Sequence, residues 1–177
     1  MRTVLLTIAF ALCLSAADYV TNSAGVLLPD PVATPGVVRT TDAKEICAKS
    51  FRTKPFRKTT QAMKKAVCAA YGVKNCPHSG VLELDHLCPL ELGCADDIRN
   101  LWPEPASPTP GYHQKDVLEN FLHREVCAGR LGLQVAQQQI MHDWYSAWLA
   151  IPRKNPGSLV SVNPVDNVDP AIDPATR

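Results

Sequence analysis

Two adjacent residues with complementary chemistry, Asp85 and His86, close the alternating stretch 81–85. A carboxylate binds a hard divalent cation, and an imidazole accepts a proton from water near neutral pH. Their adjacency therefore predicts metal-assisted hydrolysis, with the cation and the base at one site. A surface ion pair is the alternative for an isolated Asp-His pair, so the interpretation depends on the residues that follow.

Two more polar residues follow at short intervals. Asn100 begins the next predicted strand, and its amide both donates and accepts hydrogen bonds, so we expect it to pin the loop that carries His86. An ordinary turn asparagine is the alternative. His113 opens a predicted helix, from which its imidazole reaches back to complete a carboxylate-imidazole metal pair with Asp85.

The elements that must position these residues are a hairpin and the helix after it. Alternation predicts a strand over 81–85 and a partner over 98–102, joined by a long loop. Consecutive side chains of a regular strand point to opposite faces, so Asp85 and His86 meet at one site only if the strand loses its regularity there. Prolines from 103 to 110 predict irregular structure up to Gly111, where the helical pattern begins.

Three further helices are predicted around this hairpin and helix. Asp42 begins the first, Thr60 begins the second, and the third covers residues 133–150. The fold class is therefore α+β, mainly helical.

Charge is balanced overall, with 18 basic and 17 acidic residues, but it is uneven along the chain. Basic residues dominate between 44 and 74, and acidic residues dominate between 83 and 104. A cationic arm beside an acidic hairpin suits a polyanion held near a cation site. We expect Arg52, Arg57 and Lys58 to contact the backbone of a nucleic acid. Solvated helix faces are the alternative for the basic run alone.

The ends of the chain differ from its middle. Arg2, the apolar run 3–14 and the small residues 15–17 are typical of a removable export signal over 1–17, and the run is shorter than the roughly 20 residues that cross a bilayer. We expect an extended lead-in over 18–39, one domain over 40–151 and a disordered tail over 152–177. The mature protein is predicted to be secreted or periplasmic, without a membrane contact.

Export also decides how the cysteines are interpreted. Six remain after the signal, and an oxidising compartment predicts three disulfides among 15 possible connectivities. No Cys-x-x-Cys pair is present, which argues against a structural zinc knuckle.

Three segments together resemble an HNH endonuclease domain of the ββα-metal type, as carried by small exported bacterial proteins. They are ELDHLCPLELG at 83–93, NLWP at 100–103 and KDVLENFLHREVCAG at 115–129. The resemblance spans about residues 35–148, and the order and spacing of the segments are more specific than any one of them. The sequence departs from the family in its proline-rich insert before the helix and in Cys94, where a second glycine is usual.

The resemblance implies a hairpin and a helix that together hold one divalent ion, Mg²⁺, Mn²⁺ or Zn²⁺. It implies that Asp85 binds the metal, that His86 is the general base and that Asn100 is the central asparagine. His113 best matches the family's last histidine, because it lies just inside the helix and two positions before a lysine. His123, further along the same helix, is the second candidate.

The resemblance also implies that Cys47 pairs with Cys127. The simplest remaining pairs are then Cys68 with Cys76 and Cys88 with Cys94. Metal ligation by these cysteines is the alternative.

The sequence thus predicts an exported, metal-dependent endonuclease that hydrolyses phosphodiester bonds of DNA, with RNA as a second substrate. Sequence specificity is not expected, because no basic helix carries a base-reading pattern. A non-catalytic, disulfide-stapled binding module on the same scaffold is the alternative from another class. A nuclease toxin and a DNA-uptake factor would share the chemistry and differ in their partners.

Overall fold

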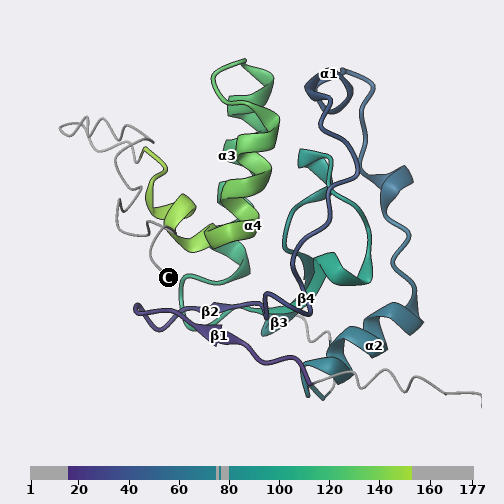
Figure 1. The fold of residues 1–177 in the computed structure, drawn as a ribbon, viewed down its shortest axis with the longest axis vertical. Helices are drawn as coiled ribbons and strands as arrows, with labels where there is room; N and C mark the ends of the chain where they lie inside the picture. Colours follow the sequence, from purple (N-terminus) through teal and green to yellow (C-terminus); the bar gives the residue numbers. More distant parts are fainter. Residues whose placement is uncertain (1–15, 75, 77–79, 153–177) are drawn as a thin grey trace, which may run out of the picture.

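The computed structural model describes residues 16–74, 76 and 80–152 (Figure 1). This described part is α+β, as predicted, with four α-helices, two small antiparallel sheets and three disulfides. The predicted signal, apart from its last two residues, and the predicted tail after residue 152 lie outside the described residues. None of the described helices is both long and apolar enough to cross a membrane.

The fold begins earlier than the sequence indicated. Residues 18–39 are largely extended, but they form a ribbon of β1 (Val20–Thr21) and β2 (Leu27–Leu28) that packs on the domain. Tyr19 donates a hydrogen bond of 2.6 Å to the carbonyl of Pro103, and Thr34 is buried against Tyr71 and the Leu101 carbonyl. The lead-in is therefore part of the core packing, because its apolar and hydroxyl side chains find partners on the hairpin.

Two helices precede the hairpin, α1 (Ala43–Ile46) and α2 (Gln61–Ala70). Both begin at the predicted caps: Asp42 accepts from the Lys44 N–H at 2.9 Å, and Thr60 accepts from the Met63 N–H at 3.1 Å. Such caps satisfy backbone donors that have no partner within the first turn. Between the two helices, a 3₁₀ turn at Lys54–Phe56 carries part of the basic run.

The hairpin consists of β3 (Leu82–His86) and β4 (Leu101–Pro105), paired so that Asp85 faces Trp102 across the ladder. The prediction of a partner strand at 98–102 was wrong by three residues, and β4 runs through two prolines that were expected to break it. A two-stranded sheet explains this difference. Pro103 and Pro105 occupy alternate positions, where the backbone nitrogen points away from β3, so neither removes a ladder hydrogen bond.

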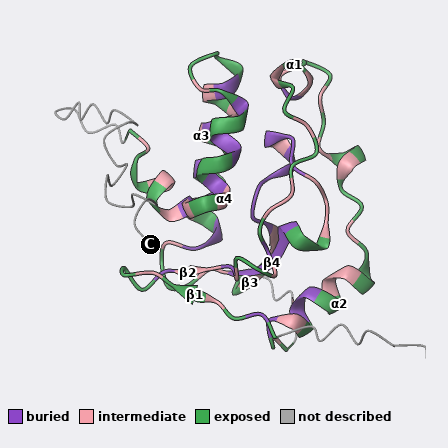
Figure 2. Ribbon diagram, in the orientation of Figure 1, coloured by how far each residue is buried: buried purple, intermediate pink, exposed green. Residues whose placement is uncertain are grey.

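Two long helices complete the domain, α3 (Tyr112–Cys127) and α4 (Leu133–Leu149), the latter kinked at Asp143. They pack against each other, and buried and exposed residues alternate along α3 (Figure 2). The buried face of α3 includes a charged side chain, because Lys115 is fully buried, whereas the apolar Val117 is 56% exposed. The core between the helices and the hairpin is formed by Trp102, Leu118, Leu122, Ala136, Ile140 and Trp144.

The three disulfides have the predicted pairing: Cys47 with Cys127, Cys68 with Cys76 and Cys88 with Cys94. The first joins positions 80 residues apart and ties the end of α1 to the end of α3. By the chain-entropy estimate, closing so long a loop stabilises the fold by about 4 to 5 kcal/mol, against about 2 to 3 kcal/mol for the two short loops.

Candidate active site

His86 lies at the end of β3 with its imidazole almost closed off from solvent. Its side chain is 3% exposed, and Nε2 lies 2.9 Å from Oδ1 of Asp96. A carboxylate beside one ring nitrogen keeps the proton on that nitrogen, so Nε2 donates and Nδ1 carries the free lone pair. No hydrogen bond from the described residues engages Nδ1. The ring is therefore arranged to accept a proton through Nδ1.

Asp96, in the loop between the two strands, is itself held by the basic segment. Its carboxylate accepts from the Thr59 hydroxyl at 2.6 Å and from the backbone N–H of Lys58. Burial raises the pKa of Asp96, but the hydrogen bonds from Thr59, His86 and Lys58 outweigh burial and hold that pKa below its ordinary value. Asp96 is thus an ionised anchor for the ring.

The electrostatic surroundings keep His86 neutral near pH 7. Burial lowers the pKa of His86, and the nearby charge of Arg57 lowers it further, whereas Asp96 and Asp85 raise it. The net pKa lies below the ordinary value of a histidine, so the unprotonated base is the main form at neutral pH.

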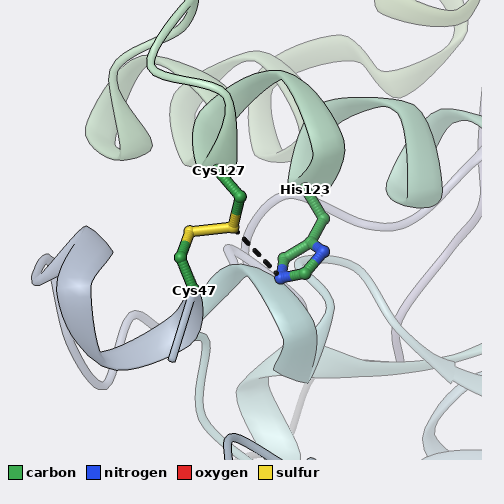
Figure 3. Close-up of side chains that lie close together, drawn as sticks. All are labelled: Cys47, His123 and Cys127. Atoms are coloured by element: carbon green, nitrogen blue, oxygen red, sulfur yellow. Dashed lines mark hydrogen bonds between the residues drawn. A yellow bond between two sulfur atoms is a disulfide. The ribbon is translucent and has the colours of Figure 1, made fainter. Parts of the chain in front are cut away.

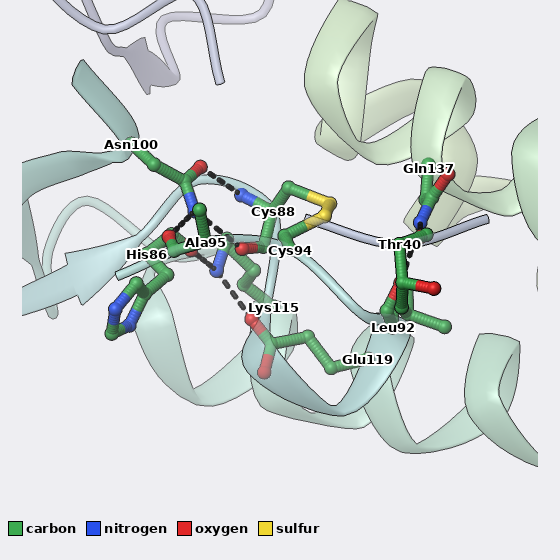
Figure 4. Close-up of a disulfide and its surroundings, with 10 residues drawn as sticks. All are labelled: Thr40, His86, Cys88, Leu92, Cys94, Ala95, Asn100, Lys115, Glu119 and Gln137. Atoms are coloured by element: carbon green, nitrogen blue, oxygen red, sulfur yellow. Dashed lines mark hydrogen bonds and ion pairs between the residues drawn. A yellow bond between two sulfur atoms is a disulfide. The ribbon is translucent and has the colours of Figure 1, made fainter. Parts of the chain in front are cut away.

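Asn100 holds the loop that follows His86 through its side-chain amide. Its carbonyl oxygen accepts from the Cys88 N–H at 3.0 Å, and its amide group donates to the carbonyls of Cys88 and Ala95 at 2.9 and 2.8 Å (Figure 4). The Cys88–Cys94 disulfide closes the same loop. Asn100 is fully buried, so these bonds are shielded from water.

Asp85 faces the opposite side of the hairpin, toward α3. Its Oδ2 lies 2.6 Å from Nζ of Lys115. The same ammonium donates to the His86 carbonyl at 2.7 Å and to Glu119 (Figure 4). The expected loss of strand regularity is not observed, since pairing continues to His86 opposite Leu101. Asp85 and His86 therefore act on each other through charge, and their side chains have separate partners.

Two further carboxyl groups surround the Lys115 ammonium. Glu104 is fully buried, its Oε2 lies 3.7 Å from Nζ, and neither oxygen receives a hydrogen bond from the described residues. Burial raises the pKa of Glu104 well above its ordinary range, and burial raises the pKa of Glu119 to about 8. For Asp85, the ammonium outweighs burial and lowers the pKa. Near neutral pH, the cluster is thus an Asp85–Lys115 ion pair with two largely protonated carboxyl groups beside it.

His113 lies on the first turn of α3, exposed, with its ring centroid 4.2 Å from that of Tyr112. Burial and the charge of Asp85 raise the pKa of Glu83 and of Asp116, and the charge of His113 lowers both. These four side chains therefore share one electrostatic neighbourhood. Among the described residues, no three of them bring ligand atoms within 4.8 Å of one another.

The donor set on this side fits a hydrated divalent ion better than a closed metal site. The Asp85 side chain is 21% exposed, and Lys115 engages its Oδ2, so a hydrated ion can approach the carboxylate from the solvent side. Mg²⁺ keeps several waters and needs only one or two protein carboxylates, whereas structural zinc requires four converging ligands. Asp85, with His113 nearby, therefore suits an ion that keeps most of its water ligands.

His123, the second candidate for the metal histidine, lies in another cluster at the far end of α3 (Figure 3). Its Nε2 is 3.6 Å from Sγ of Cys127 and 3.3 Å from the carbonyl of Ile46. Cys47, His123 and Cys127 bring their ligand atoms within 4.8 Å of one another, but the two sulfurs are bonded to each other. With no thiolate available, this cluster is not a metal site in the oxidised protein.

The three predicted nucleic-acid contacts differ in their relation to His86. Arg57 is exposed and close enough for its charge to lower the pKa of His86, and the backbone of Lys58 bonds to Asp96. Arg52 instead donates to the carbonyls of Lys49 and Phe51 in its own turn. The basic segment therefore reaches the imidazole through Arg57 and Lys58.

Sequence reasoning missed the residues that hold the two key side chains in place. Lys115 continues the spacing of the buried positions 118, 122 and 126, with Glu119 one turn later, and that pattern could have marked a buried lysine with a partner. For Asp96 the sequence carries no comparable signal, because loop geometry alone brings it to His86.

Comparison of the chain with known protein families, curated proteins and solved structures finds no match.

Proposed function

We propose that this chain is an exported, metal-dependent endonuclease with an HNH-type ββα site, which hydrolyses phosphodiester bonds of DNA, and of RNA as a second substrate, with little sequence preference. The observation that carries this proposal is the His86–Asp96 pair. A buried, neutral imidazole with one nitrogen fixed by a carboxylate and the other unbonded meets the requirements for a general base.

In the proposed reaction, Nδ1 of His86 removes a proton from a water molecule as its oxygen attacks the phosphorus. The imidazolium that forms is stabilised by Asp96, whose Oδ1 lies 2.9 Å from Nε2. A new O–P bond forms, the bond between phosphorus and the departing sugar oxygen breaks, and that oxygen takes a proton from solvent. Asn100 keeps the loop beside His86 in place throughout.

Asp85 and His113 are the proposed ligands of one divalent ion. When bound, this ion supplies Lewis-acid stabilisation to the phosphate and the departing oxygen. The neighbouring Glu83 and Asp116 add negative charge on the same side, which attracts a cation.

Arg57, Lys58 and Arg52 are proposed to bind the sugar-phosphate backbone. Arg57 is best placed for the scissile phosphate, because its charge already acts on His86. Contacts of this kind release counterions, so activity should fall steeply as salt is raised.

Three disulfides suit an oxidising compartment, in agreement with export by the predicted signal. We therefore propose a secreted or periplasmic location.

Cleavage of plasmid DNA, single-stranded DNA and RNA by the oxidised chain from residue 18 tests the proposal. Activity is expected with Mg²⁺, Mn²⁺ or Zn²⁺, none with a chelator, and a large loss in Asp85→Ala but not in His142→Ala, an exposed histidine on α4. Calorimetry should show weaker metal binding for His113→Ala than for His123→Ala. Full cleavage in the presence of chelator, or the reverse order of the two histidines, would contradict the metal assignment.

Two observations favour the non-catalytic alternative: Lys115 already neutralises Asp85, and regular strand pairing continues to His86, so the side chains of Asp85 and His86 face opposite sides of the hairpin. A binding module would retain nucleic acid without cutting it under any metal, and His86→Ala would bind as well as the wild type. A gel-shift assay run beside the cleavage assay separates the two functions.

A further inference from the structure

Lys115 makes contacts that neither its position on a helix nor the proposed reaction requires. Its ammonium donates three hydrogen bonds, to Asp85, to the His86 carbonyl and to Glu119. An ammonium has three donors, so none remains for a substrate. With no exposed surface, Lys115 also cannot reach a phosphate in solution.

We propose that Lys115 is a resident counter-ion of the metal-binding carboxylate. It holds Asp85 and the end of β3 in place in the metal-free protein, and it competes with the divalent ion for the charge of Asp85. This inference rests on the proposed function, because it assigns Lys115 a role toward the ion that Asp85 is proposed to bind.

The first half of the proposal follows from the geometry. One ammonium bonds both the side chain of Asp85 and the backbone carbonyl of His86, so the two residues that carry the chemistry are fixed by a single group from α3. Lys115 is thereby a positioning residue, and the hairpin does not depend on a bound ion for its shape.

The second half follows from charge. Lys115 engages Oδ2 of Asp85, whose side chain is 21% exposed, so an incoming ion meets a carboxylate whose charge is already compensated. Repulsion between the ammonium and the ion further weakens binding. The protein alone should hold the ion loosely, and phosphate oxygens of the substrate should supply the remaining ligands. The geometry thus predicts an ion that binds firmly together with nucleic acid.

The test compares Mn²⁺ binding by calorimetry and thermal unfolding in chelator for three oxidised proteins: the wild type, Lys115→Met and Lys65→Met. Lys65 is an exposed lysine on α2 and serves as the matched control. Lys115→Met should unfold at a lower temperature in chelator, yet bind Mn²⁺ about tenfold or more tightly than the other two, because a competing unit charge is gone. A merely structural lysine would lower stability without tightening metal binding.

If Lys115→Met does not fold, the double variant Lys115→Met/Glu119→Gln removes the buried ammonium together with one of its carboxyl partners and is measured in its place. Mn²⁺ binding by the wild type with equal or weaker binding by the lysine variant overturns the counter-ion proposal and leaves the proposed nuclease intact. Mn²⁺ binding only by the variant supports the counter-ion proposal, and loss of cleavage by the wild type in chelator then decides whether the wild type uses the metal. Absence of binding in both overturns both.

Discussion

The two faces of the hairpin end carry opposite kinds of polar cluster. On one face, His86 and Asp96 form a pair with an unbonded ring nitrogen and an arginine nearby. On the other, Asp85, Lys115 and Glu119 form a closed network in which every donor of the ammonium is used. The first cluster has an unused proton-accepting position, whereas the second has its charges matched internally.

This difference indicates a division of labour. A side chain that exchanges protons needs an acceptor atom that has no hydrogen-bond partner. A side chain that only holds its neighbours in place is best served when all its donors are bonded. Substitutions of His86 and Asp96 should therefore change the rate of cleavage, and substitutions of Lys115 and Glu104, which contact no substrate, should change stability. Single substitutions on each face should separate the two effects.

Lys115→Met should lower the free energy of unfolding by about 3 to 5 kcal/mol, because the Asp85 carboxylate loses its cation and Glu119 loses a hydrogen bond. Urea unfolding of the oxidised protein in chelator measures this change. Lys65→Met, on the exposed surface, should stay within about 0.5 kcal/mol of the wild type. A loss below 1 kcal/mol in Lys115→Met would show that the network is not a stability element.

Asp96→Asn should reduce kcat by about 10²-fold while the protein stays folded, since an amide can donate to Nε2 and favour the wrong tautomer of His86. The pH profile gives a second readout. Activity is present above the pKa of His86 and lost as the pH falls through it, and Asp96 raises that pKa, so its removal should move the midpoint to lower pH. Asp97→Asn, which removes the charge of the surface pair with Arg99 and keeps an oxygen to cap the turn Ile98–Asn100, is the control. An unchanged midpoint of the pH profile would show that Asp96 does not affect the protonation of His86.

Arg57→Gln should weaken cleavage by about tenfold. It should also reduce, by about one, the slope of the logarithm of the nucleic-acid binding constant against the logarithm of the salt concentration. Because Arg57 lowers the pKa of His86, its removal should move the same midpoint to higher pH, opposite to Asp96→Asn. Arg130→Gln, which loses only its pair with Glu125, is the matched change. Shifts of the two midpoints in the same direction would contradict the assigned electrostatics.

Glu104→Gln should change stability by less than about 1 kcal/mol at low pH, because the carboxyl group is already protonated there. Because the pKa of Glu104 is higher in the folded protein than its ordinary value of 4.5, folding is favoured at pH values below 4.5, where the group is protonated in both states. That contribution to stability is lost as the pH rises and the unfolded chain ionises. The variant lacks this loss and should become relatively more stable toward higher pH. Unfolding curves at several pH values measure the trend, and a constant difference would mean that folding does not raise the pKa of Glu104.

Much of the local structure could be predicted because it depends on neighbouring residues. Thr60 caps α2 through a residue three positions away, and Gly111 to Cys127 carries a helical pattern that the structure follows. The disulfide pairing was also predicted, from the resemblance and from short spacings.

The remainder depends on contacts between distant segments. Thr59 and Asp96 are 37 positions apart, and Lys115 and Asp85 are 30 apart, so no local pattern indicates either pair. Pro103 can lie within β4 only because its backbone nitrogen is not needed for pairing with β3. That follows from the register of the two strands and not from the sequence near Pro103.

The most direct test of the account is single-turnover cleavage of a labelled DNA strand by the oxidised wild type and by His86→Ala, each with and without added imidazole. The account predicts a loss of about 10² to 10⁴-fold in the variant. Imidazole diffusing into the vacated space should restore part of the rate in the variant and none in the wild type. Equal rates for the two proteins would contradict the assignment of His86 as the base.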